Sequence, residues 1–390
     1  MPGFSSMDAL INALSNGRKW RQDWNKNFLP TTAGVAGQWS FLARGGGNPG
    51  ADALYNSGTN LLFQPTYDTT TNAAGIRHGG NVNPYYKSVI NASAFTAAAT
   101  VAPCVLMLVD LIGFYRVTST TTTTSQACTN TLMAFATTVC NTNDILTNTG
   151  TGSNSEINLF PYTRVRFTTT GTLPTGLSLA TDYYVIKLTD TTISVATSYA
   201  NAVAGTAVAI TTGTGSGTHT LNCLLPRYTS GAGVQCFWWA NNATPLGAGT
   251  PNCSLASYTN SAQSTGRATP TVLPIGKTAA ENGMVVYSGT GIGKYGPFMP
   301  QQSGDSGIAQ IDNMQISSTY TSGEFSMALC APILTIPITT LGVAGERDLV
   351  NQLPSLPRIY DGANLHWLIY NGANTPTNSA IAGHLDFAWN

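Results

Sequence analysis

The tetrapeptide Gly304-Asp305-Ser306-Gly307 contains the residue types that come closest to a catalytic motif in this sequence. The same four residues surround the nucleophile in one class of serine protease, where a histidine base and an orienting carboxylate complete the site. His78, however, lies between an arginine and glycines instead of the small-residue and cysteine context of those proteases, and Ile308 replaces a following glycine. We therefore expect a turn between strands, which glycine, aspartate and serine favour, and no catalytic role.

A second motif, Gly291-Ile-Gly-Lys-Tyr-Gly296, has the glycine spacing of dinucleotide-binding loops. In such loops a helix begins directly after the glycines, so that its N-terminus meets the pyrophosphate. Pro297 and Pro300 interrupt that position here. The motif is therefore interpreted as a surface loop, and no cofactor is expected.

The other residues with catalytic or metal-binding side chains are scattered along the chain. Asp110, Asp305 and Asp361 lie far apart in sequence, whereas glycoside hydrolysis needs two carboxylates placed together. Neither the four histidines nor the seven cysteines have the spacing of a metal site. We therefore expect no catalytic residue, no metal and no enzymatic activity. The odd cysteine count indicates buried thiols formed in a reducing cytoplasm, although Cys128 and Cys140 flank one loop and could form a disulfide.

Charged residues are rare. Asp, Glu, Lys and Arg make up 9% of the 390 residues, against roughly 25% in an average soluble domain. The 17 basic and 17 acidic residues cancel, so the chain has no field to attract nucleic acid or an anionic membrane. The most apolar stretch, residues 94–117, contains Pro103 and Asp110 and predicts a buried strand instead of a membrane span. This composition indicates a structural protein that packs against neighbouring subunits.

One helix is predicted near the N-terminus, between Ser6, which can cap its start, and Gly17, which can end it. A basic and aromatic segment follows at residues 18–26, but its few positive charges are interrupted by Asp23 and indicate only a weak contact with nucleic acid. We expect residues 1–29 to form a helical arm that docks on its own or a neighbouring subunit. The apolar residues at helical spacing are Met7, Leu10, Ile11 and Leu14.

From about residue 30 the sequence consists of short apolar or alternating runs separated by Gly, Pro, Asn and Thr, the pattern of all-β sandwiches and barrels. Both faces of the run 365–370 are apolar, so this strand is expected to be covered on both sides. The sequence predicts an all-β fold with a jelly-roll-like β-sandwich core, a short N-terminal helix and an inserted small β domain. Other predicted strands are 38–42, 105–111, 233–240, 283–287 and 325–338.

The composition changes near residue 118, where a Thr/Ser run begins, and a second polar linker follows at 142–154. A compact β-rich unit comes next, with short strands predicted at 165–169, 182–188, 192–196 and 207–211. We therefore divide the chain into the arm, a β-sandwich core formed by residues 30–144 and 222–390, and an inserted β module at 145–221.

The module resembles a small β module that recurs in virion proteins of tailed bacteriophages. The resemblance rests on Val165-Arg-Phe-Thr-Thr-Thr-Gly-Thr-Leu-Pro-Thr-Gly-Leu177 and Asp182-Tyr-Tyr-Val-Ile-Lys187, with residues 204–206 and 213–221. Flanking segments are similar to phage structural proteins as well. These segments are residues 8–14, Arg77-His-Gly-Gly-Asn-Val82, 105–111, Tyr295-Gly-Pro-Phe298, 346–349, Leu353-Pro-Ser-Leu-Pro-Arg358 and 385–389.

The resemblance implies a capsid-associated structural protein, made in the host cytoplasm and located in the virion. No helical period follows the first twenty residues, as the spine helix of the usual tailed-phage shell protein would require. We therefore expect a decoration or cement protein, a homotrimer that stabilises the head by binding other capsid proteins. The alternatives are a shell-forming major capsid protein built from jelly rolls, a tail or receptor-binding component and, outside virions, a secreted hydrolase or carbohydrate-binding module.

Two segments are predicted to contact neighbouring subunits. The first is the arm, whose aromatic side chains could anchor an interface. The second is the charged segment near residue 350, because charges in so uncharged a chain are expected to fix a subunit contact. The candidate interface residues are Trp20, Trp24, Phe28, Glu346, Arg347, Asp348 and Arg358.

Overall fold

The computed structural model consists mainly of antiparallel β-strands, which confirms the predicted all-β sandwich class. The narrower jelly-roll designation stays a prediction. The residues that the structure describes are 4, 6–27, 36–49, 62–63, 75–79, 86–96, 101–118, 124–128, 131–136, 144–147, 162–189, 192–241, 244–270, 283–286, 296–352, 356–373 and 379–390.

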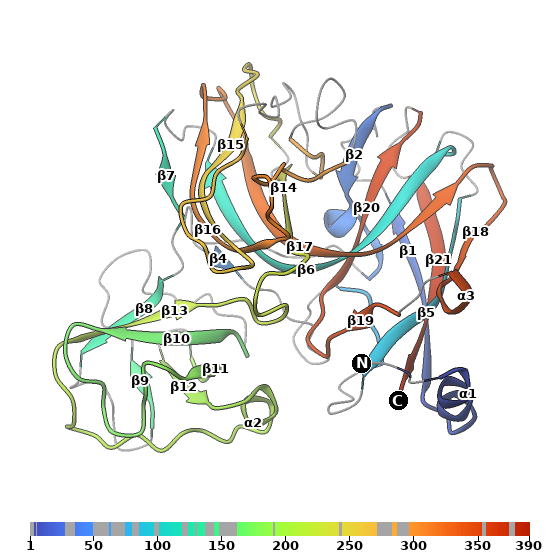
Figure 1. Ribbon diagram of the computed structural model, residues 1–390. Coiled ribbons are helices and arrows are strands. Elements are labelled where there is room, and N and C mark those ends of the chain that lie inside the picture. The colour runs from blue at the N-terminus through green and yellow to red at the C-terminus, as the bar shows by residue number, and fades with distance from the viewer. Residues whose placement is uncertain are drawn as a thin grey trace.

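A long antiparallel ribbon of two 15-residue strands, β6 (Cys104–Thr118) and β17 (Glu324–Ile338), runs through the middle of the large lobe (Figure 1). It is the centre of a sheet in which the strands follow the order β14-β17-β6-β20-β2, with β4 beside β6. The side chains on both faces of β20 are buried, as its apolar sequence predicts. The outer strands are β14 (Gln235–Ala240), β20 (Leu365–Asn371), β2 (Gln38–Phe41), which continues into the 3-10 turn η1 (Leu42–Arg44), and β4 (Leu62–Phe63).

One end of the ribbon packs against a sheet that contains strands from both ends of the chain, which we call the terminal sheet. Leu106 and Leu108 of β6 share a buried cluster with Trp24 and Phe387 from this sheet. The order of its strands is β18-β5-β21-β1-β3, and β19 also pairs with β5. The strands are β1 (Lys19–Asn27), β3 (Gly47–Asn48), β5 (Lys87–Phe95), β18 (Gly345–Asp348), β19 (Arg358–Ile359) and β21 (Ala380–Trp389).

The other end of the ribbon forms a second core with a three-stranded sheet of order β15-β16-β7. Phe114 of β6 and Phe325 of β17 belong to this core, and the ring of Trp238 stacks on Phe325 with 5.1 Å between centroids. The large lobe is therefore two β-sandwiches that share β6 and β17. The strands of the small sheet are β7 (Gln126–Ala127), β15 (Cys253–Asn260) and β16 (Ile308–Ile316).

The N-terminal helix α1 (Met7–Ser15) has the predicted ends. Ser6 Oγ accepts a hydrogen bond from the backbone N–H of Ala9 at 3.1 Å, and Gly17 adopts the left-handed conformation with φ +74°. The predicted arm does not extend to residue 29, however, because β1 is paired with β21 along its whole length. A separate arm is therefore limited to α1. A second short helix of the large lobe is α3 (Leu349–Gln352).

The module is a separate small lobe (Figure 1), and its sheet has the order β8-β13-β10-β11-β12-β9. It starts before the predicted boundary at 145, because β8 pairs with β13. The segment 207–211 is not a strand, although Val208 N–H donates to the carbonyl of Val195. The elements are β8 (Thr131–Ala136), β9 (Leu146–Thr147), β10 (Arg164–Thr169), β11 (Asp182–Lys187), β12 (Thr192–Ala196), α2 (Tyr199–Val203) and β13 (Thr218–Cys223).

A buried ion pair joins the ribbon to the chain that leaves the module. Arg227 Nε and Nη2 donate to the two carboxylate oxygens of Asp110 at 2.8 and 2.7 Å, and both side chains are almost fully buried. The backbone N–H of Asn364 donates to the same carboxylate at 2.9 Å, and Arg227 Nη2 also donates to the carbonyl of Leu111. Three segments that are remote in sequence therefore meet at Asp110.

Replacing Asp110 with asparagine tests how much the fold depends on this pair. Asp110→Asn keeps the shape of the side chain but leaves the buried Arg227 without its counter-ion, which should lower the free energy of unfolding by about 3 kcal/mol. The matched control is Glu324→Gln, which breaks the half-exposed pair with Arg116 and should cost about 1 kcal/mol or less. Urea denaturation measures the free energy of unfolding of both variants. Equal losses would contradict the claim that the fold depends on the Asp110–Arg227 pair more than on the Arg116–Glu324 pair.

Candidate functional site

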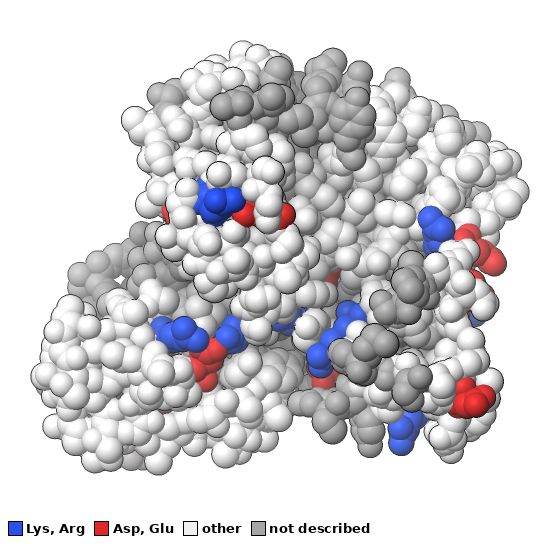
Figure 2. Space-filling model, in the orientation of Figure 1, with Lys and Arg blue, Asp and Glu red and all other residues white. Residues whose placement is uncertain are grey.

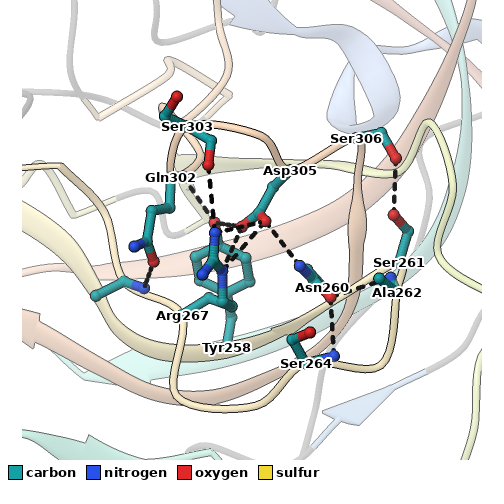
Figure 3. Close-up of polar contacts among 11 residues, drawn as sticks. Tyr258, Asn260, Ser261, Ala262, Ser264, Arg267, Gln302, Ser303, Asp305 and Ser306 are labelled. Carbon is teal, nitrogen blue, oxygen red and sulfur yellow. Dashed lines mark hydrogen bonds and ion pairs between the residues drawn. The ribbon is translucent and has the colours of Figure 1, made fainter.

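The carboxylate of Asp305 is the centre of a dense polar cluster between β15 and the segment before β16 (Figure 3). It accepts hydrogen bonds from Tyr258 Oη at 2.5 Å and from Asn260 Nδ2 at 2.7 Å. Arg267 contributes both Nε, at 3.1 Å, and Nη2, at 2.9 Å. The Asp305 side chain is only 1% exposed. We call this arrangement the Asp305 clasp.

The clasp strongly favours the ionised carboxylate. Hydrogen bonds from Arg267, and then from Tyr258 and Asn260, lower the pKa of Asp305 to about 2, although burial acts in the opposite direction. Burial, followed by the hydrogen bond to Asp305, raises the pKa of Tyr258 to about 12. At neutral pH the carboxylate therefore holds no proton to donate, and its acceptor positions are used within the clasp.

Ser306 has no histidine base beside it. Its Oγ lies 2.8 Å from Ser261 Oγ (Figure 3), and the N–H of Asp305 closes a turn onto the carbonyl of Gln302. A Cβ at Gly307 would collide with the carbonyl oxygen of Gly231, so the final glycine of the motif is required by packing. The predicted turn is confirmed. The histidines lie elsewhere: His78 beside Lys87, His219 beside Thr169, His384 near Asp386 and His366 against the Phe41 ring.

The described cysteines also lack the surroundings of a nucleophile. All six are buried, and burial raises the pKa of Cys104 and of Cys128 to about 12. Cys140, the other half of the predicted disulfide with Cys128, lies outside the described residues, as does most of the glycine motif 291–296. Within the described ranges, no group of three or more His, Cys, Asp or Glu could hold a metal ion.

All the described interface candidates belong to the terminal sheet. Trp20 and Trp24 are on β1, but their roles differ. Trp20 is 42% exposed and remains available for a contact, whereas Trp24 is 2% exposed and packs on Trp367 with 4.8 Å between ring centroids. Trp24 is therefore a core residue and the prediction that it anchors an interface is wrong. Phe28 lies outside the described residues.

The charged candidates are used in different ways. Arg347 Nε donates to the carbonyl of Thr335 at 2.8 Å, so this guanidinium helps to fix β18 on β17. Asp348 caps α3 by accepting from Val350 N–H at 3.1 Å. Glu346 is exposed on β18, and Arg358 lies outside this edge, in a cleft beside the module.

The outer face of the terminal sheet has a hollow of about 340 Å³ with an apolar residue, Phe95, at its edge. Beside Phe95 lies the hairpin-like turn that leads from β17 to β18, where Gly342 N–H donates to the carbonyl of Thr96 and Leu341 and Val343 are exposed. We call Phe95, Leu341 and Val343 the hairpin patch. The sequence analysis did not predict this patch, although the apolar residues Leu341 and Val343 in a turn could have indicated it. The hollow is lined by Arg21, Asp23, Trp24, Asn25, Asn48, Ser93, Phe95, Ala382, Gly383 and His384.

Comparisons with known proteins identify no relative: no family model, no curated protein and no solved structure matches the chain. Among the described helices, none is long and apolar enough to cross a membrane.

The Asp305 clasp predicts a specific dependence of stability on pH. The pKa of Asp305 is about 2 in the folded protein, below its ordinary value of 3.8. The stability contributed by the ionised form is therefore present above about pH 4 and is lost as the pH falls towards 2. Asp305→Asn should destabilise the protein at pH 7, and its difference from the wild type should shrink over that range. Urea denaturation across a pH series measures this difference.

The control for this experiment is Ser306→Ala, which retains the carboxylate and should follow the wild-type pH profile. If Asp305→Asn and the wild type lose stability in parallel between pH 4 and pH 2, the clasp does not hold Asp305 in its charged form.

Proposed function

We propose that this protein is a structural component of a phage virion, a decoration protein that stabilises the head by binding other capsid proteins and copies of itself as a trimer. The proposal rests on two features taken together. Many charged side chains pair with one another within the protein, and the apolar hairpin patch is exposed at the edge of the terminal sheet. The resemblance of the module implies a virion protein, and the narrower role of a decoration protein rests on the composition and on the lack of a long helix in the described part of the chain.

The distribution of charge supports a packing role. In Figure 2 the charged atoms form a few groups, several with blue and red together, and most of the visible surface is uncharged. Buried or half-buried pairs account for many of the acidic residues, including Asp110 with Arg227, Asp305 with Arg267 and Glu324 with Arg116. A surface with so little net and local charge repels a neighbouring subunit weakly.

The hairpin patch gives this surface a place for contact. Val343 is 58% exposed, and Phe95 and Leu341 beside it are also exposed large apolar side chains. The patch adjoins the hollow of the terminal sheet, which offers hydrogen-bonding groups such as Asn25, Ser93 and His384. An apolar centre with polar surroundings is the usual composition of a protein interface.

The shape of the chain supports a decoration protein over a shell-forming subunit. In the described part of the chain the longest helix is α1, with nine residues, which is far shorter than a spine helix. Binding to heads that lack the chain tests the proposal: the purified protein should co-sediment with them and raise their melting temperature. Protein that stays in the supernatant would overturn the proposal.

The hairpin patch predicts which substitution weakens head binding. Val343→Asp places a charge at the centre of the patch, and burying it unpaired at an interface should weaken binding by about tenfold or more. The control is Leu179→Asp, which changes a similarly exposed apolar residue on the module and should bind as the wild type does. Equal affinity of the two variants in a sedimentation titration would exclude the patch as the contact.

A further inference from the structure

A cleft of about 220 Å³ lies where the module meets the large lobe. The module contributes Tyr184 from β11 and Tyr199 from α2, and the large lobe contributes Arg358 from β19 and the residues that follow it. Figure 2 shows Lys and Arg atoms along this junction, with Asp or Glu atoms beside them. The full lining is Tyr184, Tyr199, Pro226, Arg227, Thr229, Arg358, Ile359, Tyr360, Asp361 and Gly362.

A buried donor with no hydrogen-bond partner among the described residues lies next to the cleft. Arg227 is 4% exposed, and its Nε and Nη2 donate to Asp110, but its Nη1 has no hydrogen-bond partner. This Nη1 lies 3.7 Å from the position that a Cβ would occupy at Gly362, and Tyr199 Oη lies 3.5 Å from the same point. An unsatisfied buried N–H costs stability, and this one lies beneath the lining of the cleft, close to Gly362.

The wall of the cleft contains a second guanidinium whose donors are unused. The Arg358 guanidinium lies over the rings of Tyr86 and Tyr360, with 5.3 and 4.4 Å to their centroids. These stacking contacts orient its plane without using its N–H groups, and within the described residues it has no carboxylate partner. Since Arg227 is balanced by Asp110 and Lys87 by Asp361, Arg358 leaves one positive charge in excess at the cleft.

We propose that this cleft binds an acidic saccharide, a sugar ring that carries a carboxylate or a phosphate. Arg358 binds the anionic group, because guanidinium N–H groups match the geometry of carboxylate and phosphate oxygens. The tyrosine rings and hydroxyls line the sugar ring, which has apolar C–H faces and polar edges. This inference does not depend on the proposed role in a virion.

The arrangement of the aromatic rings favours a sugar over a nucleobase. A planar base stacks best between or upon open aromatic faces. Here Tyr184 and Tyr199 are nearly perpendicular, with 85° between their planes, and Arg358 covers one face of Tyr360.

Calorimetric titration of the full chain with five probes, namely glucose 6-phosphate, glucuronate, glucose, inorganic phosphate and AMP, tests the proposal. Glucose 6-phosphate and glucuronate should each bind at least about tenfold more tightly than glucose, which lacks the anionic group. Inorganic phosphate should bind more weakly than glucose 6-phosphate, because it makes no contact with the tyrosines. The proposal is overturned if glucose binds as well as the acidic sugars, if phosphate alone binds as well as the sugar phosphate, or if neither acidic sugar binds.

Two variants locate the binding in the cleft. Arg358→Gln should reduce the affinity for glucose 6-phosphate to that for glucose, whereas Arg21→Gln, which removes an exposed charge on the terminal sheet, should leave it unchanged. Gly362→Ala keeps all charges but places a methyl group between Tyr199 and Arg227, and it should weaken binding of every sugar severalfold. Thermal melting confirms that each variant is folded. Equal losses in both arginine variants, or tighter binding of AMP than of glucose 6-phosphate, would overturn the proposal.

Discussion

The buried contact between Asp110 and Arg227 is the interaction on which most of the remaining structure depends. Asp110 lies in the middle of β6, next to the point where the two cores of the large lobe separate. Its carboxylate binds the chain that leaves the module and the backbone of Asn364 at the start of β20. A buried pair of this kind stabilises a fold only when its hydrogen bonds are well formed. It therefore fixes where the chain from the module crosses the ribbon, next to the cleft that Arg227 helps to line.

The pairing of charged side chains within the protein also explains why the chain offers few candidate catalytic groups. Asp305 has its acceptor positions filled by Tyr258, Asn260 and Arg267, and its lowered pKa keeps it ionised. Groups that would perform acid or base catalysis elsewhere are used to join loops and strands. The described surface retains few charged side chains, and it includes the exposed apolar residues of the hairpin patch and one arginine stacked on tyrosines.

Sequence patterns predicted the local features and missed the long-range ones. Ser6 and Gly17 delimit α1 because capping acts within one turn, and apolar runs predicted the strands of the ribbon. Trp20 and Trp24 have similar neighbours in sequence and both pair with β21, and only the packing of Trp24 on Trp367 of β20 buries it. The start of the module at β8 depends on its pairing with β13, more than eighty residues later. The Asp110–Arg227 pair joins residues 117 positions apart, which no local pattern could indicate.

The measurement that tests the proposed role most directly is the mass of the purified chain in solution, determined by mass photometry over a concentration series. A decoration protein binds a lattice that another protein builds, so the account predicts discrete species of one or three times the chain mass of 40.8 kDa at every concentration. Closed particles of megadalton mass, formed by this chain alone, would contradict the account, because the protein would then build the shell itself.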